Sequence, residues 1–315
     1  MIKFTAKRIL STVPTVLITL LIAFLIVRVI PGDAAWVVLG EDATPEEVAA
    51  WRAENGLDKS WIEQYGIWLL DIARGNMGAS LINGQPVVQS ILRCMEPTLL
   101  MVTMSTLIAV ALGIPIGVIA ALKRNSPIDT VIMSTSMVAL ATPSFWLGLM
   151  LCLWFAVQLR WFPVSGYKTI AAGGFWNAVK CLFLPALSLG TRRVANIARF
   201  TRSCMLDVIQ SDHVRTARAK GVREARIVTR HMLKSTMAPI ITTIGLGIAN
   251  EFAGALVTER IFNIPGIGLL TYNAIVNRDI QLLQAVIVYV ALVYIVINLI
   301  LDILYKHYDP RIELD

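Results

Sequence analysis

Long apolar runs constrain the fold of this chain more than any other feature of its sequence. The clearest of them cover residues 9–30, 98–122, 131–157 and 282–305. About 20 apolar residues in a helix cross a hydrocarbon core about 30 Å thick, so each run is long enough to span a bilayer. Only helices and closed barrels satisfy their backbone in lipid, and these runs lack the alternation of barrel strands. They predict an all-α polytopic membrane protein.

Two weaker runs, 182–200 and 239–257, bring the predicted number of transmembrane helices to six. Arg192 and Arg193 interrupt the first of them. The composition agrees with a membrane protein, because only 16% of the 315 residues are charged, whereas about a quarter are charged in soluble domains. The first run is too long for a secretory signal peptide and lacks a clear cleavage site. We therefore expect an uncleaved first helix.

Basic residues are concentrated on one predicted side of the membrane. The stretch from Arg192 to Lys234 contains eleven Arg or Lys residues and three acidic ones. The segment 31–97 has the opposite balance, with ten acidic residues against four basic ones. Because short cytoplasmic loops carry an excess of Arg and Lys, the basic stretch and both termini are predicted to be cytoplasmic. Segment 31–97 is predicted to lie on the outer side.

The outer segment contains two capping boxes, Thr44-Pro45-Glu46-Glu47 and Ser60-Trp61-Ile62-Glu63. They predict helices over 45–55 and 61–73, each followed by a glycine that can end it. The second helix has an apolar face that includes Trp61 and Trp68. These helices either lie on the lipid surface and cover the bundle, or receive a soluble partner, for which Trp61 and Trp68 are the candidate docking residues.

Motifs of catalysis are absent from the sequence. It contains no Gly-x4-Gly-Lys-Ser/Thr phosphate-binding loop, no Gly-x-Ser-x-Gly and no His-Glu-x-x-His. Its four cysteines have no paired spacing, and its three histidines are far apart. We therefore expect a chain that is not an enzyme and that holds neither a cofactor nor a metal ion. Any energy source must be supplied by another protein.

The basic stretch has the pattern of two helices joined at a glycine. Ser211 or Asp212 can cap a helix over 213–220, and a second helix is predicted over 222–233. Gly221 lies between them and would cost about 1 kcal/mol inside a continuous helix. This pattern predicts a helix–glycine–helix elbow in the cytoplasm. A basic helix held at anionic lipid is the alternative, at about 1 kcal/mol per charge; nucleic acid is disfavoured because lipid competes for the same face.

The sequence "ARFTRSCMLDVIQSDHVRTARAKG" at 198–221 resembles the signature of the inner-membrane permease subunits of bacterial ABC importers, in the dipeptide, oligopeptide and nickel branch. That family has a cytoplasmic loop written EAA-x3-G-x9-I-x-L-P. Here Arg215-Thr216-Ala217 stand at the EAA positions and Gly221 is the glycine; His231 and Leu233 stand at the I and L positions. Lys234 replaces the proline. "IPGD" at 30–33 and "LVTERIFNIPGIGLL" at 256–270 are also similar to this branch.

The resemblance implies the type-1 ABC importer permease fold with a helical periplasmic insertion. Its parts are the N-terminal end with the first helix at 1–30, the insertion at 31–97, the core at 98–305 with coupling helices at 211–234, and a cytoplasmic tail at 306–315. It implies a multi-pass protein of the bacterial inner membrane. It also implies a second homologous permease, two cytoplasmic ATPase subunits that bind ATP and Mg, and an outer solute-binding protein.

By the same resemblance, the elbow is the coupling helix that inserts into a cleft of an ATPase subunit. The residues implied in this contact are Arg215, Thr216, Ala217, Gly221, Arg223, His231 and Leu233. Gly221 is expected to let the chain turn tightly, with a positive φ, where a side chain would clash. The substrate implied is a dipeptide or oligopeptide, with glutathione, nickel, an opine or a sugar as alternatives within the branch. An ion-driven secondary transporter or a membrane scaffold remains an alternative of another class.

Three charged residues lie where lipid is expected. Arg192 and Arg193 are about 15 Å deep in their run, and Glu251 is about 18 Å from the inner face. A charge at such a depth costs at least about 2.5–3.5 kcal/mol. Either an arginine pairs with Glu251 inside the bundle, or these residues line the translocation pathway and bind the charged ends of a substrate. Arg202 lies nearer the cytoplasmic end, where it is expected to snorkel.

Overall fold

The computed structural model describes residues 2–29, 34–40 and 42–308. The Ile-Pro-Gly-Asp stretch at 30–33 and the tail beyond residue 308 therefore lie outside the described residues. Helices dominate this part of the chain, which has no strand and only an isolated bridge between Ala79 and Pro86. The all-α class is confirmed. The chain forms two compact units, residues 1–96 with 265–295 and residues 97–264 with 296–315.

The first unit contains the outer segment. Its helices are α1 Ile2–Val29, α2 Ala34–Leu39, α3 Pro45–Glu54, α4 Trp61–Ala73, α14 Ile267–Val276 and the N-terminal parts of α5 Val87–Leu122 and α15 Ile280–Tyr308. Both capping boxes are present: the Thr44 hydroxyl accepts a hydrogen bond from the Glu47 amide, and Ser60 does the same for Glu63. The two predicted outer helices are confirmed because their start and stop signals are local.

Helix α4 packs its aromatic face on α1 within this unit. The ring of Phe24 lies 5.0 Å from that of Tyr65 in an edge-on arrangement, and 5.8 Å from that of Trp68. Leu20 and Ala23 are buried in the same cluster, and Leu69 and Ile72 pack against it. This helix is therefore fixed to the end of α1 rather than being a loose surface element.

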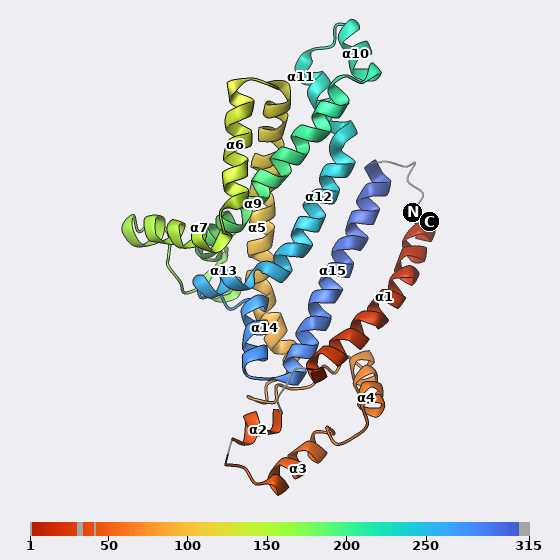
Figure 1. Cartoon of the computed structure of the whole chain (residues 1–315), viewed down its shortest axis with the longest axis vertical. Coiled ribbons are helices and arrows are strands. Elements are labelled where there is room, and N and C mark those ends of the chain that lie inside the picture. The colour runs from red at the N-terminus through yellow and green to blue at the C-terminus, as the bar shows by residue number, and fades with distance from the viewer. Residues whose placement is uncertain (1, 30–33, 41, 309–315) are drawn as a thin grey trace. The chain divides into compact units, whose positions relative to one another are not determined.

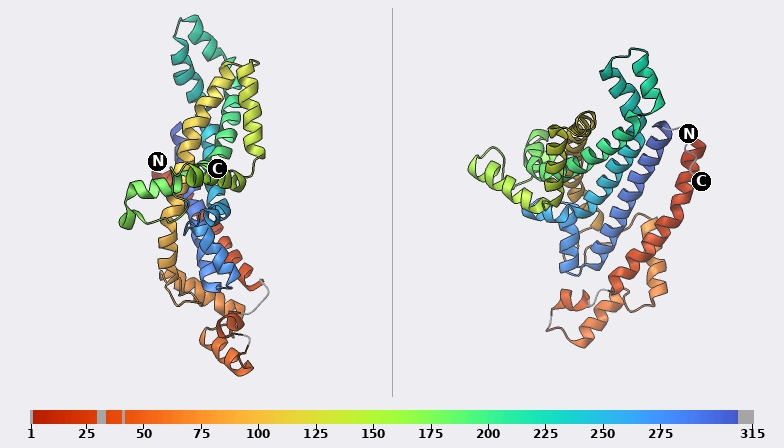
Figure 2. Two further views of the ribbon diagram at one scale, coloured as in Figure 1. Left: turned by 90° about the vertical axis from the view of Figure 1, so that its left-hand side faces the viewer. Right: turned by 45° about the horizontal axis from the view of Figure 1, so that its top comes forward.

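The second unit contains the elbow and the buried charges. Its helices are the rest of α5, α6 Pro127–Ala141, α7 Ser144–Leu151 with the π-helical turn η1 Cys152–Gln158, α8 Ile170–Gly173, α9 Phe175–Ile209, α10 Asp212–Ala219, α11 Glu224–Arg226 with the π-helical turn η2 Ile227–Met232, α12 Leu233–Gly254, α13 Leu256–Ile261 and the end of α15. Helix α9 packs against both α6 and α12 (Figures 1 and 2).

The predicted third span, 131–157, is not one straight helix. Helices α6 and α7 are bent by 97° relative to one another, with the break at Thr142 and Pro143. Thr142 has an extended backbone, with φ −75° and ψ 124°, because the ring of a following proline disfavours the helical region. The prediction of a continuous span was wrong here, although the Thr-Pro signal is in the sequence.

Other helices are longer than predicted. Helix α5 begins at Val87 rather than at residue 98, and α9 extends from Phe175 to Ile209 without a break at its two central arginines. By length and composition, three of the described helical stretches can cross a membrane, or four if the bent pair is one span. The apolar part of α1, Ser11–Ile26, is shorter than these stretches and is not counted among them. The count of six spans and the predicted boundaries at residues 30, 97 and 305 stay predictions.

Two glycines bring α5 against α9. A methyl group built on Gly117 would lie 2.5 Å from the carbonyl oxygen of Ala198 and 2.7 Å from the Cβ of Thr201. One built on Gly113, a turn earlier, would lie 2.9 Å from the Cβ of Ile197. Small residues permit such close contact between helices in membranes. The C-terminal half of α9 is therefore closely packed against α5.

Candidate functional site

The elbow connects the end of α9 with the start of α12 (Figure 1). Its first helix, α10, ends in a Schellman motif: the Gly221 amide donates to the Arg218 carbonyl at 2.9 Å, and the Val222 amide donates to the Ala217 carbonyl at 3.2 Å. Gly221 has φ +69°, a left-handed conformation that glycine adopts without strain. The predicted helix–glycine–helix geometry is confirmed at this position.

Of the two reasons expected for the glycine, a clash and a positive φ, only the positive φ is found. A methyl group built on Gly221 meets no atom within 4 Å, so a side chain would not clash. The requirement comes from the positive φ, which disfavours residues with a Cβ and most strongly the β-branched ones. The second helix also differs from the prediction, because α11 and η2 continue directly into α12 and do not end at Leu233.

The elbow has a hydrophobic core of its own. Val214 and Ala217 of α10 are buried against Met205 of α9 and against Ile227 and Met232 of η2. Ala217 is only 7% exposed, and this burial is within its own chain. The elbow is therefore fixed by apolar packing to the end of α9, and η2 continues directly into α12.

The outer surface of the elbow is basic. Arg215, Arg223, Arg226 and Arg230 are exposed, as are the hydroxyl-bearing Thr216 and the glycine at 221. Arg218 forms an ion pair with Glu224 at 2.7 Å, which joins the two helices across the glycine. The other two predicted contact residues, His231 and Leu233, are half-buried. The structure thus places four of the seven predicted coupling residues on the outer surface, two in half-buried positions and Ala217 inside.

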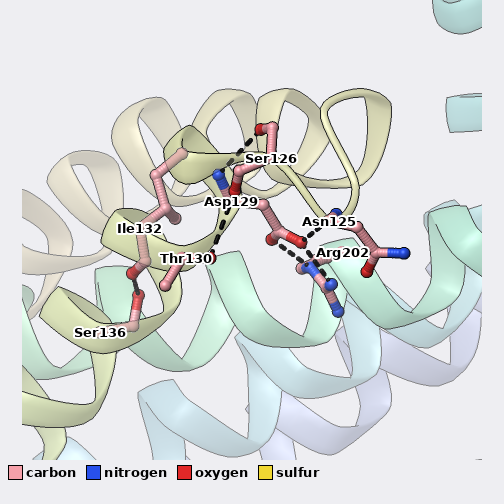
Figure 3. Close-up of polar contacts among 7 residues, drawn as sticks. All are labelled: Asn125, Ser126, Asp129, Thr130, Ile132, Ser136 and Arg202. Carbon is pink, nitrogen blue, oxygen red and sulfur yellow. Dashed lines mark hydrogen bonds and ion pairs between the residues drawn. The ribbon is translucent and has the colours of Figure 1, made fainter.

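A buried carboxylate holds α9 next to α6 close to the elbow. Both guanidinium donors of Arg202 contact Asp129, with Nε and one terminal nitrogen each 2.7 Å from a carboxylate oxygen (Figure 3). The Asn125 amide donates to the same carboxylate at 3.1 Å, and Ser126 caps α6 through the Asp129 amide. Arg202 was expected to snorkel, and the structure adds a bidentate partner that holds its guanidinium.

A second buried pair lies halfway along α9. The Arg193 guanidinium donates to a Glu251 carboxylate oxygen at 2.8 Å and to the Thr106 hydroxyl at 2.7 Å. Its other terminal nitrogen donates to the Ile244 carbonyl at 2.9 Å. Ser105 donates to the remaining oxygen of Glu251 at 2.8 Å. The cluster therefore joins α5, α9 and α12 through groups that bond with one another.

Of the three charges expected inside the membrane, the structure brings two together. The side chains of Arg193 and Glu251 are 10% and 9% exposed. Arg192 is exposed on another face of α9, and its side chain makes no ion pair or hydrogen bond to the part of the chain that the structure describes. A pair with Glu251 was one of the two interpretations of the sequence, and Arg193 is the arginine that forms it.

Sequence reasoning missed a third buried carboxylate. Glu259 on α13 is fully buried and accepts a hydrogen bond from the Thr98 hydroxyl at 2.7 Å. Its partner is 161 residues away in the sequence, so no local pattern could identify the contact. The only signal was that Glu259 follows an apolar stretch that a charged residue would not be expected to join.

The two candidate docking residues of the outer segment have different surroundings. The Trp61 side chain, at the start of α4, is 57% exposed. Trp68 is half-buried, and its ring is 5.8 Å from that of Phe24. Trp61 can therefore contact another protein without any rearrangement, whereas Trp68 contributes to the packing of α4 on α1.

Two family descriptions match almost the whole chain. One, "Binding-protein-dependent transport system inner membrane component", matches residues 113–314, and its N-terminal counterpart matches residues 1–102. The dipeptide transport system permease protein DppB of Alkalihalophilus pseudofirmus is 35% identical over 99% of this chain and 100% of that relative. The di/tripeptide transport system permease protein DppB of Pseudomonas aeruginosa is 39% identical over 99% of both.

A solved structure shows the same fold. A chain of the inward-facing MetNI methionine ABC transporter superposes with a TM-score of 0.60 and covers 71% of this chain and 98% of its own length. The two sequences are only 16% identical, so this likeness concerns the fold alone. It agrees with the type-1 permease fold expected from the sequence.

Proposed function

Because the chain belongs to the family of binding-protein-dependent transport system inner membrane components, we propose that it is the permease subunit of an ATP-driven importer of di- and oligopeptides. The two relatives named above support the substrate class, because they match end to end and are described as dipeptide and di/tripeptide permeases. The chain is a multi-pass protein of the inner membrane, and its fold resembles that of an ABC importer chain.

The proposed assembly supplies what this chain lacks. A second homologous permease completes the pathway, two cytoplasmic ATPase subunits bind ATP and Mg, and a solute-binding protein delivers the substrate on the outer side. Both termini of this chain are then cytoplasmic. Membrane lipid surrounds it, and nucleic acid is not a partner.

The elbow is the observation that carries this proposal. It presents exposed basic side chains outward while its apolar side chains, Val214 and Ala217 among them, pack on its own chain. Such a surface suits a protein partner that approaches from the cytoplasm, and the internal core keeps the elbow from deforming when it is pushed. Closure of the ATPase dimer on ATP would displace the elbow as a rigid body, together with α9 and α12.

The bond between Asp129 and Arg202 extends this displacement to α6. Arg202 lies seven residues before the end of α9 at Ile209, about 10 Å along the helix axis. The bidentate contact fixes α6 to α9 at that point. Movement of the elbow is therefore expected to move α6 as well, through a bond rather than through apolar contacts alone.

The proposal is tested with the assembled complex in lipid nanodiscs. The measurement is ATP hydrolysis with and without the solute-binding protein loaded with a dipeptide. We expect hydrolysis to rise on addition of the loaded protein and the ATPase subunits to co-purify with this chain. A chain that co-purifies with no ATPase, or uptake that follows an ion gradient without ATP, would contradict the proposal and favour a secondary transporter.

The outer helices are predicted to receive the solute-binding protein. Deleting helices 45–55 and 61–73 should spare membrane insertion, which the apolar spans drive, and should remove the stimulation of ATP hydrolysis. Since the deletion also uncovers Phe24, Trp61→Ala is the sharper variant. A central tryptophan of an interface contributes about 2 kcal/mol or more, so stimulation should require at least about 30-fold more loaded binding protein. Unchanged stimulation in both variants would show that these helices only cover the bundle and do not bind the solute-binding protein.

Loss of the Asp129–Arg202 bond is predicted to weaken the coupling of transport to hydrolysis. In Arg202→Gln, dipeptide uptake per ATP hydrolysed should fall severalfold, because α6 no longer follows α9. Arg199→Gln is the matched control, since Arg199 is an exposed arginine of the same helix. The exchange variant Asp129→Arg with Arg202→Asp should restore part of the ratio. Equal ratios in Arg202→Gln and the control would show that the bond has no part in coupling.

A further inference from the structure

A pocket of about 310 Å³ lies in the first unit, next to the packed aromatic face of α4. Its wall includes side chains from the end of α1, from α3 and the link to α4, from α4 itself and from the start of α15. The six that matter here are Arg28, Glu54, Lys59, Trp68, Asp71 and Gln284. The volume is at the lower end of the range for small-molecule sites, about 300–1,000 Å³.

Four charged groups line this pocket, two of each sign. Arg28 and Lys59 are the cations, and Glu54 and Asp71 are the anions. None of the four forms an ion pair within the ranges that the structure describes. Charges that are close in a fold usually form pairs with one another, so four unpaired charges around one small space leave both signs available to a ligand.

Arg28 is the most constrained of the four. Its Nε and one terminal nitrogen donate to the Gln64 side-chain oxygen at 3.2 and 2.6 Å, and the other terminal nitrogen donates to the Phe24 carbonyl at 3.1 Å. The guanidinium lies 3.3 Å from the centre of the Phe24 ring. All of these partners are uncharged, so the half-buried cation has a fixed position and no counter-ion among the described residues.

A buried amide adds a second, independent observation. Gln284 is 4% exposed, and its side-chain nitrogen has no hydrogen-bond partner among the described residues. A buried donor left unpaired costs about 1–3 kcal/mol. Gln284 is one of the residues that line the pocket, and a half-turn of its amide exchanges the positions of its nitrogen and oxygen. A polar ligand would then satisfy a group that the chain itself leaves unsatisfied.

We propose that this pocket binds a zwitterion, an amino acid or a small peptide, with its carboxylate at Arg28 and its ammonium at Asp71. These two residues are half-buried, whereas Lys59 and Glu54 are exposed, so their attraction to a ligand is less screened by water. A ligand that is only anionic would meet two carboxylates, and one that is only cationic would meet two cations. The proposal rests on the proposed function, because it gives the outer end of the permease a site for its own substrate class.

The test is direct binding of labelled Ala-Ala to the assembled complex in nanodiscs, without the solute-binding protein and without ATP. Two further probes are the amide of Ala-Ala, which lacks the carboxylate, and N-acetyl-Ala-Ala, which lacks the ammonium. We expect each blocked probe to bind about tenfold or more weakly than Ala-Ala, the lower end of the contribution of a hydrogen bond to a charged group.

The variants assign each end of the ligand. Arg28→Gln should bind Ala-Ala and its amide equally, because the carboxylate has lost its partner. Asp71→Asn should bind Ala-Ala and the N-acetyl probe equally. Arg74→Gln and Asp42→Asn are the matched controls, since both residues are exposed and lie outside the pocket wall. Arg28→Lys keeps the charge and should retain discrimination against the amide if Arg28→Gln fails to fold.

The proposal is overturned if wild type binds none of the probes, if it binds the blocked probes as well as Ala-Ala, or if the control variants change affinity as much as the pocket variants. Because neither ATP nor the binding protein is present, these outcomes are separate from a failure of the importer function. That failure would appear as absent stimulation of ATP hydrolysis.

Discussion

Glu251→Leu is expected to lower the free energy of unfolding by about 3–5 kcal/mol, the cost of breaking a buried ion pair from one side. The side chain of Arg193 is 10% exposed, and the substitution leaves it with the Thr106 hydroxyl and the Ile244 carbonyl as its only partners among the described residues. The measurement is thermal unfolding of the purified complex in nanodiscs, in which the fraction of folded chain is recorded as the temperature rises. Arg192→Leu is the matched control, because Arg192 is exposed on the same helix.

The double variant Arg193→Leu with Glu251→Leu is expected to regain stability close to that of wild type, since apolar residues of similar volume can replace a buried pair. It also separates the two interpretations of these charges. Both carboxylate oxygens of Glu251 and both terminal nitrogens of Arg193 are bonded within the chain. We therefore expect dipeptide uptake at the wild-type rate. A stable double variant that hydrolyses ATP but imports no dipeptide would instead assign the pair to the pathway.

Gly221→Val is expected to abolish uptake while the chain remains in the membrane. Valine at φ +69° is strained by more than the roughly 1–2 kcal/mol that a left-handed residue costs, because it is β-branched. The end of α10 then moves to relieve the strain, and the exposed basic residues lose their arrangement. Uptake and co-purification of the ATPase subunits are the measurements. Gly221→Asn is the control, because asparagine tolerates this region, and it should retain much of the activity.

Ala217→Glu is expected to have the same outcome for a different reason. Ala217 lies in the core of the elbow against Ile227 and Met232, so the new carboxylate is buried in this chain rather than in a partner cleft, where it has no counter-ion. The elbow itself should unfold locally, detected as faster backbone hydrogen exchange over 212–232. Normal exchange with loss of ATPase binding would show that Ala217 contacts the partner after all.

Local signals in the sequence predicted local structure well. The capping boxes at 44–47 and 60–63 and the turn at Gly221 depend on residues a few positions apart, and all three are present in the structure. The positive φ of Gly221 was predicted, but the expected clash was wrong because a clash depends on neighbours that the sequence does not reveal. The break before Pro143 was equally readable, since it rests on two adjacent residues.

For contacts between distant residues, the sequence could predict the type of contact but not which residues form it. The depth of the charges in their runs gave a pair between an arginine and Glu251 as one of two interpretations, but neighbouring positions on a helix point about 100° apart. Choosing between Arg192 and Arg193 therefore requires the rotation of α9 about its axis. The bonds of Asp129 to Arg202 and of Thr98 to Glu259 span 73 and 161 residues, and no periodicity in the sequence encodes them.

The attachment of α9 to α12 at two separate points has a mechanical consequence. One attachment is the apolar core of the elbow around Met205, and the other is the ion pair at Arg193, twelve residues or about 18 Å away along α9. Two helices in contact at a single point can rotate about that point. Two contacts that lie far apart prevent this rotation, so α9 and α12 move as one rigid body. A push on the elbow would then be transmitted along both helices as far as Arg193, and an apolar pair of similar volume at positions 193 and 251 would preserve this second attachment.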